Sequence, residues 1–275
     1  MIPTFLFTLA GGMMLALSTG RYDQIAWRFL RLTILIAFAL SCGTTLWLFR
    51  DRGAPGVPNP WFFILAGVMC VGLVVLILIA PMAAQRSAAF RLLALIAGLV
   101  GVALGSWWAI RNAGDSPELS RFLFLIGGQL LAALLLGSVT VAWLLGHAYL
   151  TATRMTIAPL RHFSSLLSWS VAARSLFVSL SLLLIYVRRS ASPLSGDAVV
   201  GLETAWDHVM GAWLILSLRL GVGLVAVAVF AYMVRDCVRL RSTQSATGIL
   251  YFGSVFAYLG ELAGLQLTRE IGWPL

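Results

Sequence analysis

The sequence has few charged residues. Only 11% of its 275 residues are charged, while 60% are hydrophobic. A soluble domain has about 25% charged residues, so this chain cannot cover a water-facing surface. Its composition also excludes a disordered chain, which needs low hydrophobicity and high charge, and a nucleic-acid-binding protein, because the basic residues are dispersed among apolar runs. The sequence predicts an all-α, polytopic transmembrane helical bundle that forms one domain over residues 1–275.

Lysine is absent, and all 19 basic residues are arginine. This absence excludes a retinal Schiff base and other lysine-based covalent chemistry. The three cysteines, Cys42, Cys70 and Cys237, share no metal-type spacing, and an odd number argues against a disulfide framework. The chain also lacks a P-loop, an HExxH motif and a paired-aspartate motif. We therefore expect no catalytic residues, no metal site and no catalytic activity of its own.

Apolar runs separated by short loops predict eight membrane spans. They cover residues 3–18, 25–49, 60–82, 88–110, 122–150, 164–187, 209–234 and 248–267. Each span except the first has the length of about 20 residues that a crossing helix needs. An even number of spans puts both termini on the same side of the membrane.

Arginines are more numerous at the membrane side opposite the termini. That side holds Arg21, Arg28, Arg31, Arg86, Arg91, Arg154, Arg161, Arg235, Arg239 and Arg241. The positive-inside rule then places both termini outside. We expect an integral membrane protein, in a bacterial cytoplasmic membrane, that contacts membrane lipids.

Three strongly polar side chains lie well inside predicted spans. They are Arg219 in the seventh span, Glu261 in the eighth and Gln129 in the fifth. Ionisable groups are rare at such positions because each costs roughly 2.5–3.5 kcal/mol at a helix centre. Counted from the outer ends of the spans, Arg219 is about 15 Å deep, Glu261 about 9 Å and Gln129 about 10 Å. A short loop joins spans seven and eight, so we expect an Arg219–Glu261 pair in the outer half of the bundle, with Gln129 nearby.

The eighth span carries a polar stripe that includes Glu261. Tyr251, Ser254, Tyr258 and Glu261 fall on one helical face, which we expect to contact protein or water. Two interpretations are open. The stripe and the ion pair could lock neighbouring helices together, or they could line a polar cavity that binds a quinone head group, a proton or a small solute.

A second polar cluster is predicted near the inner membrane face. His147 is followed by Tyr149, Thr151 and Arg154, and Arg174 lies about 15 Å from the inner end of the sixth span. His147 could be a haem ligand, a quinone hydrogen-bond partner or a proton carrier. It could equally be a membrane-edge histidine that bonds to a neighbouring helix.

Haem is not expected, because the three histidines do not share a depth. His147 is near the inner face, His162 in an inner loop and His208 at the outer edge. His208 follows Glu203 and Asp207, and we interpret this segment as an amphipathic interfacial stretch with Trp206 as its belt residue.

Short loops, the lack of a soluble module and the few polar groups predict a membrane subunit of a larger hetero-oligomeric complex. We expect a respiratory or electron-transfer assembly in which this chain acts as an anchor and docks a quinone. In size and number of spans it resembles the eight-helix quinol-handling anchors of bacterial molybdopterin oxidoreductases, with no motif matched.

Two alternative functions are open. One is a small-solute or proton transporter that uses Arg219 as anion anchor and Glu261 as titrating group. The other is a lipid-modifying enzyme with His147, Arg154 and Arg174 at the inner interface.

Overall fold

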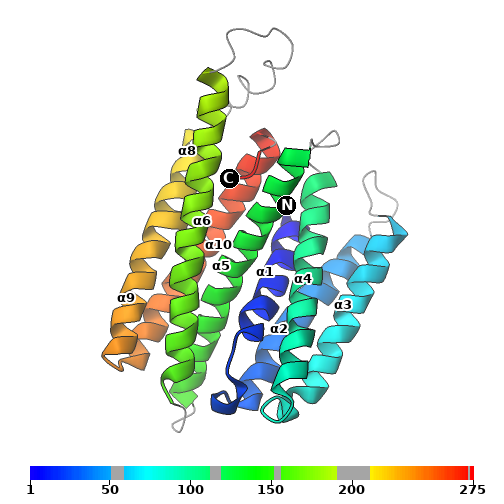
Figure 1. Cartoon of the computed structure of the whole chain (residues 1–275), viewed down its shortest axis with the longest axis vertical. Coiled ribbons are helices and arrows are strands. Elements are labelled where there is room, and N and C mark those ends of the chain that lie inside the picture. Colours follow the sequence, from blue (N-terminus) through cyan, green and yellow to red (C-terminus); the bar gives the residue numbers. More distant parts are fainter. Residues whose placement is uncertain (51–58, 112–118, 152–155, 191–210, 272) are drawn as a thin grey trace.

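The computed structural model of the chain is a bundle of long helices (Figure 1). It describes residues 1–50, 59–111, 119–151, 156–190, 211–271 and 273–275, and these contain helices and no strand. Seven helical segments are long and apolar enough to cross a membrane, and a shorter apolar helix, α1, precedes them. The predicted fold class is confirmed, and the chain has the features of an integral membrane protein.

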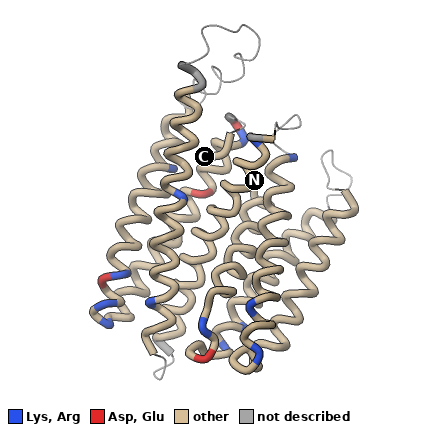
Figure 2. The backbone as a smooth tube through the Cα atoms, in the orientation of Figure 1, with Lys and Arg blue, Asp and Glu red and all other residues tan. Residues whose placement is uncertain are grey.

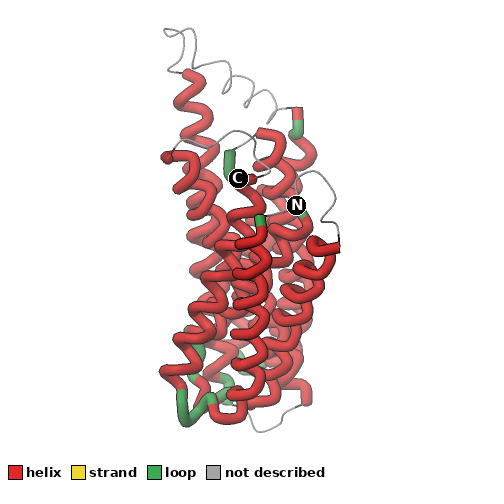
Figure 3. The backbone as a smooth tube through the Cα atoms, turned by 90° about the vertical axis from the view of Figure 1, so that its right-hand side faces the viewer, coloured by secondary structure: helices red, strands yellow, loops and turns green. Residues whose placement is uncertain are grey.

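The helices run along one common direction, with the loops at the two ends of the bundle (Figure 3). Both termini lie toward the same end (Figure 1). The elements are α1 (Ile2–Ser18), η1 (Tyr22–Gln24), α2 (Trp27–Arg50), α3 (Pro60–Ile79), η2 (Ala80–Met82), α4 (Ser87–Arg111), α5 (Leu119–Thr151), α6 (Ala158–Ser190), α8 (Trp213–Ser217), η3 (Leu218–Ala226), α9 (Val227–Arg239) and α10 (Thr243–Ile271).

Helix α1 lies inside the bundle rather than against lipid. It packs on α4, α5 and α2, and nearly all of its residues from Pro3 to Leu17 are buried. Its 17 residues give a length of about 26 Å, less than the hydrocarbon core of about 30 Å. Because protein surrounds α1, it does not have to match the membrane thickness.

Glycines allow α1 to approach its neighbours closely. A Cβ atom built on Gly101 of α4 would lie 2.7 Å from the Cα atom of Gly11. On the other side of α1, Gly12 meets Gly137 of α5 backbone against backbone. Small residues at such positions let membrane helices pack without a gap for lipid. Helix α1 is therefore held in place mainly by van der Waals contacts with its neighbours.

The seventh span is one continuous helix with three parts. It begins as α8, widens into η3, which is a π-helix, and continues as α9. A tight turn then reverses the chain into α10. In this turn Arg241 has a φ of 58°, and the amides of Arg241 and Ser242 donate to the carbonyls of Val238 and Cys237. This is the Schellman arrangement that closes a helix with a left-handed residue.

Several helices extend beyond the predicted spans. The sixth begins at Ala158 instead of residue 164, the seventh ends at Arg239 instead of residue 234, and the eighth begins at Thr243 instead of residue 248. Hydropathy marks the part of a helix that lies in hydrocarbon. The backbone hydrogen bonds of the helix continue into the interfacial region, where arginine and serine side chains are tolerated.

Candidate functional site

Three charged side chains meet inside the C-terminal half of the bundle. Glu261 of α10 accepts a hydrogen bond from Arg219 of η3, with Nη1 and Oε1 2.9 Å apart. It also accepts two from Arg174 of α6, over 3.1 Å from Nε to Oε1 and 2.9 Å from Nη2 to Oε2. The exposed fractions are 4% for Arg174, 0% for Arg219 and 2% for Glu261. We call these three residues the Arg–Glu–Arg cluster.

The depth of the cluster is apparent from the distribution of charge. Most charged positions lie near the two ends of the bundle, whereas one acidic position lies between them with basic positions close by (Figure 2). Arg174, Arg219 and Glu261 are the buried charged side chains among the described residues. The predicted Arg219–Glu261 pair is therefore confirmed, and Arg174 completes it.

The helical hairpin of η3, α9 and α10 places Arg219 opposite Glu261. Leu240 lies in the turn of this hairpin, and each of the two residues is 21 positions away from it. Next to the ion pair, Gly223 and Gly260 bring the two backbones together, because a Cβ atom built on Gly223 would lie 2.5 Å from the Cα atom of Gly260. The close approach fixes the depth of both charged residues.

Gly264, one turn further along α10, makes room for the Arg219 guanidinium. A Cβ atom at Gly264 would lie 2.9 Å from the Nε atom of Arg219. Arg219 itself belongs to the π-helix, a rare conformation that is often found at functional sites. The local sequence therefore gives Arg219 both an unusual backbone and a space cleared for its side chain.

The cluster has excess positive charge and free hydrogen-bond donors. Arginine stays protonated in proteins, so with Glu261 ionised the three side chains carry one net positive charge. Both ion pairs in which each partner is a described residue involve Glu261. The Nη1 atom of Arg174 and the Nε and Nη2 atoms of Arg219 are buried without a hydrogen-bond partner in the described part of the chain. Each such donor costs about 1–3 kcal/mol, and an acceptor supplied by a bound water or ligand would satisfy them.

A small cavity of about 10 Å³ adjoins the cluster, and Arg174 and Glu261 form part of its wall. Gln129 of α5 and Thr8 of α1 line it too, and the Thr8 hydroxyl donates to the Gln129 Oε1 atom over 3.0 Å. The backbone carbonyl of Leu275 also borders the cavity and accepts a hydrogen bond from the Arg174 Nη2 atom over 3.2 Å. This volume holds about one water molecule. The prediction that Gln129 lies near the ion pair is thus confirmed.

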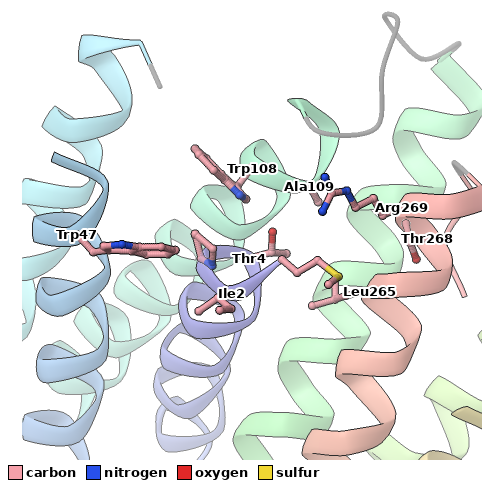
Figure 4. A pocket seen from close by; sticks show the side chains of 10 residues that line it. Ile2, Thr4, Trp47, Trp108, Ala109, Leu265, Thr268 and Arg269 are labelled. Carbon is pink, nitrogen blue, oxygen red and sulfur yellow. The ribbon is translucent and has the colours of Figure 1, made fainter. Parts of the chain in front are cut away.

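A larger cavity of about 310 Å³ lies beyond this small one, at the end of the bundle that carries the termini. Figure 4 shows Trp47 and Trp108 on one side, Thr268 and Arg269 on the other, and Thr4 between them. Leu265 and Thr268 of α10 line both cavities. We call this larger cavity the vestibule, because it shares these two wall residues with the small cavity of the cluster.

The rest of the predicted polar stripe has other partners. Tyr258 shares a hydrogen bond with Thr140 of α5, with their oxygens 2.7 Å apart, and Ser254 donates to the Tyr251 carbonyl of its own helix. Tyr251 is 51% exposed. Its aromatic ring packs against Trp143 of α5 and against Phe252 of its own helix, so Tyr251 also contacts a neighbouring helix.

The predicted inner cluster is not formed around Arg174. His147 is exposed and lies 18 residues beyond Gln129 on α5, about 27 Å along the helix, so the structure does not bring it to the Arg–Glu–Arg cluster. Placing Arg174 near the inner end was wrong because the sixth helix begins six residues earlier than predicted. This shifts Arg174 by about 9 Å toward the middle of the bundle.

The remaining histidine predictions have separate outcomes. His162 lies in α6 rather than in a loop, and its Nε2 atom is 3.0 Å from the Thr19 hydroxyl. Arg154, Glu203, Trp206, Asp207 and His208 lie outside the described residues. Within the part of the chain that the structure describes, no group of three or more His, Cys, Asp and Glu side chains is placed to hold a metal ion.

Arg174, Thr8 and Thr268 belong to the site and were not assigned to it from the sequence. A signal for Arg174 was available, because Pro159 favours the first turn of a helix and indicates the earlier start of α6. For Thr8 and Thr268 the sequence gives no comparable signal.

Comparisons with protein-family profiles, curated proteins and solved structures find no match to this chain.

Proposed function

We propose that the protein binds a small oxyanion at the Arg–Glu–Arg cluster and carries it across the membrane. The observation that supports this proposal is the excess buried positive charge together with three unpartnered guanidinium nitrogen atoms. Carboxylate and phosphate oxygens are the acceptors that match guanidinium donors best. An anion at this position would neutralise the excess charge and accept the free hydrogen bonds.

The two cavities support a route for such an anion. Arg269 at the vestibule attracts negative charge, and Thr4 and Thr268 supply hydroxyl groups along its wall. Gln129 and Thr8 follow in the small cavity, next to Arg174 and Glu261. Because that cavity holds about one water molecule, an anion can enter only if the surrounding side chains move. In this proposal the closed form is the one in which Glu261 and the Leu275 carbonyl accept the hydrogen bonds of the two arginines.

Ligand-induced stabilisation of the purified protein tests the proposal. The panel contains acetate, lactate, succinate, phosphate and sulfate, with chloride as a non-oxyanion, all at one ionic strength. We expect at least one oxyanion to raise the apparent Tm of the wild type, because a ligand at 100 times its Kd stabilises by about 2.7 kcal/mol. The Arg219→Gln variant should fold, since Arg174 and Glu261 still pair, and should lose this response. Arg28→Gln, at an exposed arginine of α2, is the matched control.

Uptake into proteoliposomes then separates transport from binding. The stabilising anion should accumulate in vesicles that contain the wild type or Arg28→Gln, and about tenfold more slowly with Arg219→Gln, the loss expected for one charge-assisted hydrogen bond of about 1.4 kcal/mol. The proposal fails if no oxyanion stabilises the wild type while Arg219→Gln melts at a higher temperature. That result would assign the cluster to helix packing.

The vestibule favours a second candidate, the docking of a quinone. Its tryptophans could stack on a quinone ring, and Thr4 and Arg269 could donate hydrogen bonds to the quinone carbonyls. This agrees with the sequence-based prediction of an electron-transfer subunit in a hetero-oligomeric complex of a bacterial cytoplasmic membrane. Decylubiquinone that quenches tryptophan fluorescence in the wild type but less in Trp108→Leu would support it. Quenching that is equal in the two proteins would count against it.

A further inference from the structure

A basic cleft lies at the end of the bundle opposite the termini, where α6 begins and α9 ends. Its volume is about 360 Å³. Arg161 and Ser165 line it from α6, and Arg235, Asp236 and Arg239 line it from α9. Arg161, Arg235 and Arg239 are exposed. The cleft therefore presents three guanidinium groups and one carboxylate in a concave surface at the membrane edge.

The described residues that line the cleft carry more positive than negative charge. Asp236 forms no ion pair within 4.0 Å with any of the three arginines, since both described ion pairs lie in the Arg–Glu–Arg cluster. Arg235 and Arg239 are four residues apart and lie on the same face of α9, where like charges repel. A ligand that brings negative charge would relieve this repulsion.

The position of Arg161 strengthens the argument. Arg235 and Arg239 lie in the last turns of α9, where cations favourably meet the negative end of the helix dipole. Arg161 instead lies in the first turn of α6, at the positive end of that helix, where a cation is unfavourable. An anion in the cleft would contact the start of α6 and all three arginines together.

We propose that this cleft binds the headgroup of an anionic glycerophospholipid. The phosphate would accept hydrogen bonds from Arg161, Arg235 and Arg239, because a guanidinium binds phosphate oxygens in a bidentate way. The hydroxyls of a glycerol headgroup would reach Asp236 and Ser165. Basic pockets between membrane helices at this depth are sites of such lipids.

The bound lipid would link the two helices that carry the arginines of the Arg–Glu–Arg cluster. Arg161 and Arg174 are 13 residues apart on α6, about 20 Å along its axis. The lipid therefore does not contact the anion site proposed above, and the two proposals can be tested separately. Its effect would be to hold α6 against α9.

Native mass spectrometry with two lipids of identical acyl chains tests this inference. Dioleoylphosphatidylglycerol should bind more tightly than dioleoylphosphatidylcholine. The Arg161→Gln/Arg239→Gln variant should bind the former about 25-fold more weakly, about fivefold for each arginine. Arg28→Gln/Arg31→Gln is the matched control, because it removes two exposed arginines from α2 at the same membrane edge, and it should keep the wild-type affinity.

Three outcomes would overturn the inference. Equal losses in the two double variants would indicate attraction to the whole charged membrane edge. Unchanged affinity in Arg161→Gln/Arg239→Gln would place the lipid elsewhere. Equally tight binding of water-soluble glycerol 1-phosphate would assign the cleft to a soluble phosphate ester. If the cleft variant does not fold, the inference is tested on the wild type alone. Exposed charges that hold the headgroup are screened by salt, so the selectivity for phosphatidylglycerol over phosphatidylcholine must fall at high salt. Selectivity that does not change with salt would overturn the inference.

Discussion

The two halves of the bundle handle buried polar groups in different ways. On α2, buried serine and threonine hydroxyls bond to carbonyls of their own helix, as Thr33 does to Phe29 and Ser41 to Ala37. In the C-terminal half, Arg174, Arg219 and Glu261 bond between three different helical segments. In the first arrangement the helices are held together by van der Waals contacts between complementary surfaces. In the second arrangement their packing also depends on ion pairs.

Glycine contacts between helices occur in both halves of the bundle but have different structural effects. Gly12 and Gly137 simply bring α1 against α5, with apolar surroundings. Gly223, Gly260 and Gly264 bring η3 against α10 at the point where an ion pair must form and where the Arg219 guanidinium needs space. Close packing alone therefore does not mark a functional site in this protein. The candidate site differs in that its close packing surrounds unpartnered charged donors.

The largest loss in the free energy of unfolding should come from Glu261→Gln, which removes the negative charge of the Arg–Glu–Arg cluster. It leaves two buried guanidinium groups facing each other without a counter-charge, a change that costs about 3–5 kcal/mol. Arg219→Gln should cost less than about 1.5 kcal/mol, because the Arg174–Glu261 pair keeps both its hydrogen bonds. Unfolding by sodium dodecyl sulfate in mixed micelles measures both values.

The Glu261→Gln/Arg219→Gln double variant sharpens this test. Removing one arginine relieves the repulsion that Glu261→Gln creates, so the double variant should be more stable than Glu261→Gln alone. Costs that simply add up would mean that the two residues do not interact across η3 and α10.

The N-terminal half should instead be sensitive to volume. Gly12→Ala places a methyl group against the Ala133 carbonyl, and overpacking of this kind costs about 1–3 kcal/mol. Gly72→Ala in α3 is the control, because nothing lies within 4 Å of the added carbon and alanine favours helix by about 1 kcal/mol. The two substitutions should therefore change the apparent Tm in opposite directions. A fall of equal size in both variants would show that helix propensity, rather than contact with α5, governs the Gly12 position.

The sequence predicts the number and order of the helices well, because a hydrophobic run of sufficient length has few other structures open to it. It predicts their ends poorly. Arg161 lies inside α6 and Arg239 at the end of α9 although neither belongs to the apolar run. Hydropathy reports the solvent around a helix, whereas the helix end depends on turn residues such as Arg241 and Pro159.

The ion pair of Arg219 and Glu261 could be predicted because both residues belong to one hairpin. Their equal separation from Leu240 gives the same depth without any assumption about the membrane. Arg174 lies on a helix with no short connection to that hairpin, so an error of six residues at the start of α6 moved it out of the site. The Thr8–Gln129 bond depends on α1 lying at the centre of the bundle, and an all-apolar helix has no pattern that distinguishes a central place from a lipid-facing one.

The smallest predicted change in the free energy of unfolding concerns the turn between α9 and α10, which fixes the register of this hairpin. Arg241 has a left-handed backbone, with a φ of 58°, a conformation that costs a non-glycine residue about 1–2 kcal/mol. Arg241→Gly should therefore raise the free energy of unfolding by about 0.5–1 kcal/mol, after the greater backbone entropy of glycine in the unfolded chain is subtracted. Leu240→Gly should lower it, because Leu240 has a φ of −82° and gains nothing from glycine. If Arg241→Gly is instead destabilising, the guanidinium at this position contributes more than the strained backbone costs. The Arg219–Glu261 register would then depend on charge at the turn as well as inside the bundle.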